Sequence, residues 1–260
     1  MTARTYLGNR SPVTVRNSNG SSPIVLVCEH ASNYIPEHLG DLGLPNEKLI
    51  EHIAWDPGAL SVAEILSDLL DAPLVYANVS RLVIDINRQP DHPGSIVTLS
   101  ETTVIPGNIE LATEERLARC ETIYRPFHER LDRVLVERHQ RESVVVSIHS
   151  FTPVYRGVSR PWHIGILHND DTRFSAPVTE ALERDRSLIV GDNEPYAPVD
   201  GVYHTIERHT APSGRPGAMV EIRNDLIMHH EGQTEWAHRL HGVLAEVCGV
   251  RNNNVSNSTL

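Results

Sequence analysis

Two histidines lie directly after apolar runs of this 260-residue chain, where they could bind a metal ion. His30 follows the run IVLVCE, and His149 follows VVVSI. A strand fixes the direction of the side chain at its end, and a neutral imidazole is a common zinc ligand. The chain has 15 histidines, and the ordinary interpretation of any one of them is a hydrogen-bonded loop residue. Two histidines at strand ends, with acidic residues nearby, favour a metal site.

A catalytic zinc ion usually has three protein ligands and one open position, so a third ligand is expected. Asp56, in the segment WDPGA, is the first candidate. Asp56 is also a good helix N-cap, because Pro57 and an apolar helical pattern follow it, and both interpretations stay open. Glu29 is a reserve candidate, although neighbouring residues on a strand point to opposite faces.

A second ligand pattern lies later in the chain, where His204 and Glu207 form an HxxE pair close to His209. On a helix, residues three apart share a face. The segment is charged and has few apolar residues, which is typical of a solvated helix face. We therefore favour the solvated face over a metal site here.

Further polar residues have the chemistry to bind and hydrolyse an anionic substrate. Asn87 and Arg88 end the run RLVIDIN, and an arginine there can hold a carboxylate through two parallel hydrogen bonds. Glu221 and Arg223 are two apart on an expected strand, so one can serve as general base and the other as an anion-binding group. Arg156, in the loop after His149, can reach the same pocket. Surface ion pairs and a solvated strand end are the ordinary alternatives.

Several motifs of other enzyme classes are absent from the sequence. The chain has no GxSxG motif, which argues against a serine hydrolase. It also lacks GxxxxGK[ST] and GxGxxG, so the common nucleotide-binding folds have no support.

Short β-branched runs alternate with longer segments of helical period. This alternation predicts an α/β fold with a mostly parallel sheet covered on both faces. The expected strands are residues 23–29, 74–78, 81–87, 143–149, 163–168, 188–192 and 217–223. The expected helices are residues 57–70, 113–140, 175–184 and 234–247. Pro126 should kink or divide the second helix, because proline lacks the backbone N–H.

Ligands of such sheets bind beyond the carboxyl ends of the strands. Polar residues end four of the expected strands: Glu29 and His30, Asn87 and Arg88, His149 and Ser150, and Glu221 to Arg223. If these strands are parallel neighbours, the polar residues converge at one edge of the sheet. Arg81 and Asp85, within the third run, are expected to be structural partners.

The composition limits the partners and the compartment of the protein. The net charge is −11, from 23 basic and 34 acidic residues, so nucleic acid and anionic membranes are poor partners. A small anionic substrate would need a local cluster of arginines. The three cysteines are scattered without CxxC spacing, and residues 1–20 hold no apolar run like a signal peptide, so we expect a cytoplasmic protein. We expect a flexible leader over 1–22, a single domain over 23–250 and a flexible tail over 251–260.

Six segments, in order, resemble the N-formylglutamate amidohydrolase family: CEHASNYIP, AWDPGA, DINR, SIHSFTP, GDNEPY and VEIRNDL. The resemblance covers about residues 24–247, and the family is distantly similar to zinc carboxypeptidases. It implies a three-layer α/β/α sandwich with a mixed sheet. The implied site has His30, Asp56 and His149 around one Zn²⁺ or another divalent ion, Asn87 with Arg88 on the substrate carboxylate, and Glu221 as base. The chain departs from the peptidase pattern at Asn33, where that pattern has its acidic ligand.

The resemblance also implies a reaction, the hydrolysis of the amide bond of an N-acyl acidic amino acid. The named reaction of the family converts N-formyl-L-glutamate to glutamate and formate, in histidine degradation. Glu221 would accept a proton from the attacking water, and Arg88, Arg223, Asn87 and Arg156 would hold the carboxylates. Two alternatives stay open: a metallopeptidase or amidase acting on a small peptide or cell-wall fragment, and a non-catalytic ligand-binding protein with a degenerate metal site.

Overall fold

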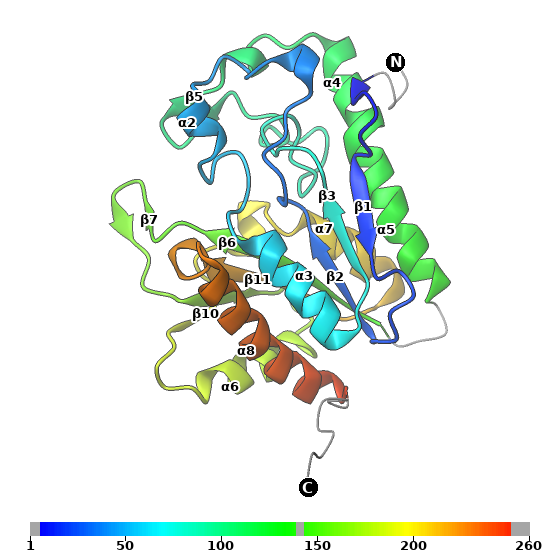
Figure 1. The fold of residues 1–260 in the computed structure, drawn as a ribbon, viewed down its shortest axis with the longest axis vertical. Coiled ribbons are helices and arrows are strands. Elements are labelled where there is room, and N and C mark those ends of the chain that lie inside the picture. The colour runs from blue at the N-terminus through cyan, green and yellow to red at the C-terminus, as the bar shows by residue number, and fades with distance from the viewer. Residues whose placement is uncertain (1–5, 139–142, 251–260) are drawn as a thin grey trace, which may run out of the picture.

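The computed structural model describes residues 6–138 and 143–250 (Figure 1). The predicted tail, 251–260, lies outside the described residues. No helix within the described ranges is long and apolar enough to cross a membrane.

A seven-stranded mixed sheet forms the centre of the molecule, with the strand order β1-β3-β2-β6-β11-β9-β10. The strands are β1 (Val13–Arg16), β2 (Ile24–Cys28), β3 (Leu74–Ala77), β6 (Val144–Phe151), β9 (Ile164–Leu167), β10 (Val190–Asp192) and β11 (Gly217–Arg223). The four central strands β3, β2, β6 and β11 run parallel. Strand β1 is antiparallel to β3, and β9 is antiparallel to β11. The predicted mostly parallel mixed sheet is therefore confirmed.

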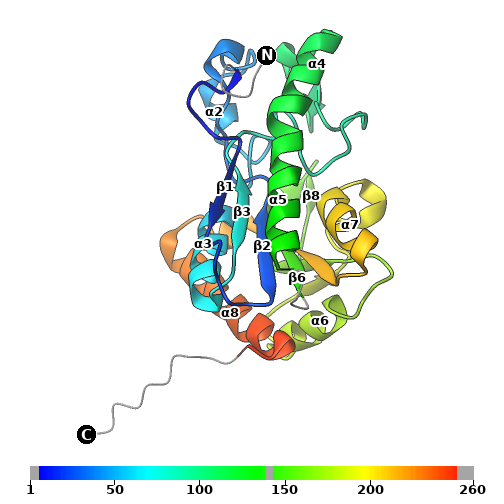
Figure 2. The same cartoon turned by 90° about the vertical axis from the view of Figure 1, so that its right-hand side faces the viewer.

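Helices cover both faces of the sheet, as Figures 1 and 2 show. Helices α3 (Ala59–Leu70), α6 (Ser175–Glu183) and α8 (His230–Cys248) pack with one set of strand side chains, and α5 (Arg125–Glu137) and α7 (His204–Thr210) pack with the other set. The sheet strands contribute alternate residues to the two cores, as the pleat requires. In α3 the buried residues Val62, Leu66 and Leu70 recur at helical spacing. Full burial of each such side chain contributes about 1.5–3 kcal/mol. These layers confirm the predicted α/β/α sandwich.

Shorter elements lie around this core. They include α2 (Asn46–Leu49), α4 (Thr113–Arg119), the hairpin of β4 (Leu99–Ser100) with β5 (Thr103–Val104), and the hairpin of β7 (Val154–Tyr155) with β8 (Val158–Ser159). Short 3₁₀ turns are η1 (Glu37–Leu39), η2 (Pro106–Asn108), η4 (Pro198–Asp200), η5 (Ala211–Ser213) and η6 (Asn224–Leu226).

The long helix predicted over 113–140 is divided near Pro126, as expected. Helix α4 leads into a π-helical turn, η3 (Cys120–Tyr124), and α5 begins directly after it. Pro126 is the second residue of α5 and follows the π turn directly, so its missing N–H falls where the hydrogen-bond pattern of the helix changes. A π turn is a common way for a helix to absorb such a disruption.

The prediction of a strand over 81–87 is wrong, because this segment is a series of turns. Val83 N donates to Ser80 O and Asp85 N donates to Ser95 O, so neither joins the sheet. The apolar side chains are nevertheless buried: Leu82, Val83, Ile84 and Ile86. A short apolar run indicates that a segment is buried, but it does not determine the backbone conformation. The same pattern therefore fits a buried loop as well as a strand.

The predicted flexible leader, 1–22, is wrong for its described part. Strand β1 pairs with β3 at the edge of the sheet, and Tyr6 and Leu7 are buried. Val13 and Val15 pack against the core that contains α5, which explains why this polar segment is ordered. The single-domain division of the chain stays a prediction.

Candidate metal centre and active-site pocket

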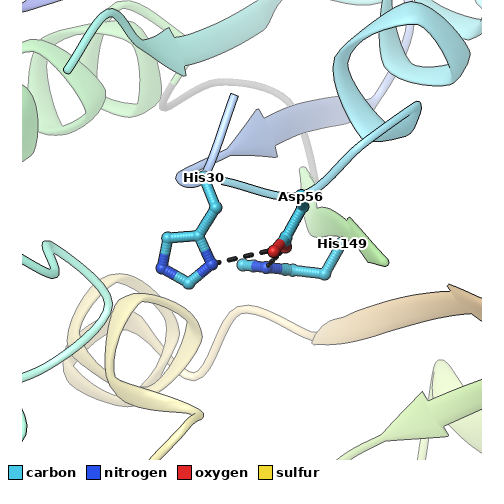
Figure 3. Close-up of side chains that lie close together, drawn as sticks. All are labelled: His30, Asp56 and His149. Carbon is cyan, nitrogen blue, oxygen red and sulfur yellow. Dashed lines mark hydrogen bonds and ion pairs between the residues drawn. The ribbon is translucent and has the colours of Figure 1, made fainter. Parts of the chain in front are cut away.

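His30 and His149 meet at the carboxyl end of the central strands. His30 lies two residues beyond β2, and His149 lies within β6, which continues to Phe151. Strands β2 and β6 are parallel neighbours, so both imidazoles are delivered to the same edge. Their ring centroids are 4.8 Å apart, and both residues are buried (Figure 3). The predicted convergence of the two histidines is present in the structure.

Asp56 completes a three-residue cluster with these histidines (Figure 3). Its Oδ2 lies 3.3 Å from His30 Nδ1 and 2.8 Å from His149 Nδ1. One donor atom of each residue lies within 4.8 Å of the others, and this is the candidate metal group found in the described ranges. Asp56 does not cap α3, because the N-cap is Gly58 and no side chain caps the helix. The N-cap interpretation of Asp56 is therefore wrong.

The outer nitrogen of each imidazole contacts a second carboxylate. His30 Nε2 lies 2.7 Å from Asp85 Oδ1, and His149 Nε2 lies 3.0 Å from Glu29 Oε2. Such carboxylates orient a ligating histidine and fix which nitrogen faces the metal. Both Nδ1 atoms therefore face Asp56. Two nitrogens and one carboxylate oxygen, supported in this way, fit the donor set of a catalytic zinc site.

The charges of Arg81 and His30 hold the Asp56 carboxylate in its charged form. Arg81 Nη1 lies 3.0 Å from Asp56 Oδ1, and His52 Nδ1 lies 3.3 Å from the same oxygen. Burial acts to raise the pKa of Asp56, but the charges of His30 and Arg81 outweigh it and hold the pKa well below the usual range. The second amino group of Arg81 lies 3.6 Å from Asp85 Oδ2, so Arg81 links the two carboxylates.

Glu221 lies beside the cluster, on the strand next to His149. The two residues are paired in the register of β6 and β11. Glu221 Oε2 is buried and has no hydrogen-bond partner among the described residues. Burial raises the pKa of Glu221 to about 7, with Asp56 adding to the rise and His149 and Arg81 opposing it. A buried carboxyl that titrates near neutral pH is suited to accepting and returning a proton.

A pocket of about 260 Å³ opens above these residues. Both hairpins contribute to its wall, through Leu99 of β4 and Tyr155 of β7. The titratable groups in its lining include His30, Asp56, His149, Glu221, Asp85, Glu101, His52, Arg81, Arg88, Arg156 and Tyr196. The metal cluster, three further carboxyl groups and three arginines thus face one space.

The predicted substrate-binding residues differ in whether they line the pocket and in the hydrogen bonds they make. Arg88 lines the pocket, and its Nη1 donates to the carbonyls of Asp200 and Gly201. Asn87 also lines the pocket, but its amide is engaged, with Nδ2 donating to Val202 O and Oδ1 accepting from Thr205 N.

Arg156 lines the pocket, whereas Arg223 lies outside it. Arg156 is exposed at the tip of the β7–β8 hairpin and lines the pocket. The Arg223 guanidinium contacts Asp225 Oδ1 and the carbonyls of Pro161 and Trp162, and it is not part of the lining. Arg223 lies two residues beyond Glu221, about 6.6 Å further along the strand, which takes it past the pocket.

The competing HxxE pattern does not form a metal group with other described residues. His204 Nε2 lies 2.7 Å from the Tyr124 hydroxyl, and Glu207 is exposed. His209 pairs with Asp132 and with His128. The segment is helix α7, which packs on the sheet.

Sequence reasoning missed several pocket residues. Arg81 and Asp85 were expected only to pair with each other, yet they also contact Asp56 and His30. Tyr196 ends the family segment GDNEPY and His52 precedes AWDPGA, but nothing in the sequence indicates a role in the pocket for either residue. Glu29, the reserve ligand, instead supports His149.

Comparison with known proteins identifies the family of the chain. The family model of N-formylglutamate amidohydrolase matches residues 22–228. Among solved structures, gene product Atu2144 from Agrobacterium tumefaciens is 45% identical, with a TM-score of 0.90 over 92% of this chain and 96% of that chain. The N-formylglutamate amidohydrolase from Ralstonia eutropha JMP134 is 20% identical, with a TM-score of 0.65 over 92% of this chain and 98% of that chain, and shares the fold. No curated protein matches the chain. The chain belongs to the N-formylglutamate amidohydrolase family.

Proposed function

We propose that this amidohydrolase depends on one zinc ion and cleaves the amide bond of an N-acyl acidic amino acid, with N-formyl-L-glutamate as substrate. The observation that carries the proposal is the arrangement of His30 and His149. Each turns Nδ1 toward Asp56 and has a further carboxylate within 3.0 Å of its Nε2. This orientation is what a metal ligand requires.

The metal would be held by His30, Asp56 and His149. When bound, a zinc ion would supply a Lewis acid that activates water and polarises the amide carbonyl. Arg81 keeps the Asp56 carboxylate charged and oriented through Oδ1, and His52 Nδ1 lies 3.3 Å from the same oxygen. Asp85 keeps the His30 ring in place, and Glu29 Oε2 lies 3.0 Å from His149 Nε2.

Glu221 would act as the general base and then as the general acid. Its unpartnered Oε2 is available to accept a proton from the attacking water. The same carboxyl would return that proton to the leaving nitrogen, which departs as the amine of the amino acid. Because Glu221 is held on β11 beside His149, the proton acceptor stays next to the metal ligands.

The cations of the pocket support an anionic substrate. Arg88, Arg156 and Arg81 line the space above the metal group, in a protein whose net charge is −11. Arg88 has its Nη1 on two backbone carbonyls, which fixes the guanidinium at the wall. We propose that Arg88 and Arg156 bind the substrate carboxylates, and that Asn87 fixes the loop that carries Arg88 by bonding to the segment before α7.

The test combines metal analysis with a substrate panel. The purified protein is expected to contain one zinc ion per chain and to release formate and glutamate from N-formyl-L-glutamate, with activity lost on chelation and restored by zinc. N-acetyl and N-succinyl amino acids and short peptides complete the panel. Preferential cleavage of peptides would instead identify a metallopeptidase. No stoichiometric zinc, with no activity after zinc addition, would indicate a non-catalytic binding protein. A cytoplasmic location and a part in histidine degradation belong to the same proposal.

A further inference from the structure

Arg160 is a buried cation enclosed by aromatic rings. It directly follows the β7–β8 hairpin and is 8% exposed. Its guanidinium carbon lies 4.5 Å from the centroid of the Tyr155 ring and 4.7 Å from that of Tyr196. No carboxylate of the described residues lies within 4.0 Å of it. The Phe151 ring centroid lies 5.8 Å away. A buried charge without a counter-ion is costly, and contact with these three rings offsets only part of that cost.

The hydrogen bond between Arg160 and Tyr196 has a fixed direction. Arg160 Nη1 lies 3.0 Å from the Tyr196 hydroxyl oxygen. A guanidinium has donors and no acceptor, so Arg160 donates and the phenolic hydrogen stays unused in this bond. Among the residues with described positions, none accepts that hydrogen. Tyr196 lines the pocket, so its O–H is available to a bound molecule there.

Tyr196 lines the same pocket as Glu221 and Arg81. Burial raises the pKa of Tyr196 to about 12, with the charge of Glu221 adding to the rise and that of Arg160 opposing it. The charge of Arg81 also acts on Tyr196, and Arg81 contacts the Asp56 carboxylate. The phenol is therefore a neutral donor at physiological pH, close to the groups proposed for water activation.

We propose that Tyr196 donates a hydrogen bond to the oxyanion that forms on the amide carbonyl of the substrate, and that Arg160 is the residue that positions it. This inference rests on the proposed function. As water attacks, its proton passes to Glu221 and the carbonyl oxygen gains negative charge. The Tyr196 hydrogen bond strengthens at that moment without transfer of its proton. Such preorganised donors act mainly on the transition state.

The kinetic test removes only the hydroxyl. Tyr196→Phe is expected to lower kcat for N-formyl-L-glutamate by about 10²-fold, with KM and zinc content little changed. Tyr203→Phe is the matched control, because it removes a buried hydroxyl that bonds to Gly217 O away from the pocket. The control should keep its kcat. Unchanged kcat in Tyr196→Phe, or a raised KM with unchanged kcat, would overturn the assignment.

A double-mutant cycle tests the role of Arg160. Arg160→Gln alone should lower kcat, and adding it to Tyr196→Phe should lower kcat no further, because Arg160 acts through the hydroxyl that is already absent. Arg160→Lys should recover part of the activity, since it keeps a charged donor. Independent, multiplying effects of the two substitutions would refute the positioning role.

A binding measurement separates this inference from the proposed substrate reaction. The probe is N-(methylphosphonyl)-L-glutamate, whose tetrahedral anionic phosphorus group imitates the attacked amide. Calorimetry on zinc-loaded protein should show weaker binding of this probe to Tyr196→Phe than to wild type, with the affinity for L-glutamate unchanged. Equal affinity of both proteins for the probe, or no binding to either, would overturn the role of Tyr196. Wild-type protein that does not hydrolyse N-formyl-L-glutamate would overturn the proposed function, and the calorimetric comparison would still decide on Tyr196.

Discussion

His149 and Glu221 are paired across the parallel strands β6 and β11, yet their side chains are held in opposite ways. His149 has a carboxylate at each ring nitrogen, Asp56 at Nδ1 and Glu29 at Nε2. Glu221 keeps Oε2 without a hydrogen-bond partner among the described residues. Neighbouring strands lie about 4.8 Å apart, so the two residues stay side by side. The pair therefore separates a fixed metal ligand from an available proton acceptor, and each can be tested alone.

Removing a ligand should remove the metal. His149→Ala takes away one of the three donor atoms, so the variant is expected to lose stoichiometric zinc, measured by plasma mass spectrometry after dialysis. His168→Ala is the control, because His168 pairs with Asp192 outside this cluster. A His149→Ala protein with full zinc content would refute the ligand role.

Removing the proton acceptor should spare the metal. Glu221→Gln keeps the shape of the side chain but cannot take up a proton, so turnover should fall by about 10²–10⁴-fold. Zinc content should match wild type, because Glu221 is not part of the donor cluster. Undiminished turnover of N-formyl-L-glutamate would eliminate Glu221 as the base.

Weakening the support of His30 should weaken metal binding without abolishing it. Asp85→Asn replaces the carboxylate 2.7 Å from His30 Nε2, and zinc affinity is expected to fall about 10- to 100-fold in competition with a chelator. Asp192→Asn is a geometrically matched control, since Asp192 lies 2.7 Å from His168 Nε2 away from the metal group. Equal affinities of the two variants would contradict the supporting role of Asp85.

Substitution of Arg88 should raise KM far more than substitution of Arg223, although the sequence predicts a substrate-binding role for both. Arg88→Met removes a cation from the pocket lining and is expected to raise KM for N-formyl-L-glutamate by at least about 10-fold, the loss of a charge-assisted hydrogen bond. Arg223→Met removes a guanidinium bound to Asp225 outside that lining, so KM should change little. Steady-state kinetics of both variants decides the matter, and a larger KM effect at Arg223 would speak against the proposed substrate pocket.

Acid should destabilise the protein partly through His204. Burial lowers the pKa of His204 to about 4, with Arg208 and His209 adding to the fall. The unfolded chain, with a histidine pKa of about 6.5, binds this proton first, so stability is complete above about pH 6.5 and declines as the pH falls toward 4. His204→Gln should therefore reduce the loss of Tm between pH 7 and pH 5. His230→Gln, at an exposed position, is the control, and equal losses of Tm in both variants would contradict the prediction.

Much of the fold follows from local pattern. The apolar runs that become β2, β6 and β11 are buried on both faces, so they are recognisable as central strands. The spacing of apolar residues in α3, and the place of Pro126 at the start of α5, are likewise local features. The strand prediction over 81–87 failed because it also rested on local composition, which indicates burial but not backbone hydrogen bonding.

The amino-acid order alone therefore identifies His30, Asp56, His149 and Glu221 as the chemical groups to consider, since each stands beside a recognisable element or in a family motif. It leaves open whether Asp56 caps a helix or faces the histidines. Only the packed chain shows that β2, β6 and β11 lie side by side, that Asp85 and Glu29 hold the outer ring nitrogens, and that Arg223 lies outside the pocket. The physical reason is that the spacing of apolar residues reflects only the local conformation of a few neighbouring residues. Side-chain contacts across a sheet depend on strand order and rotamers, which the whole fold decides at once.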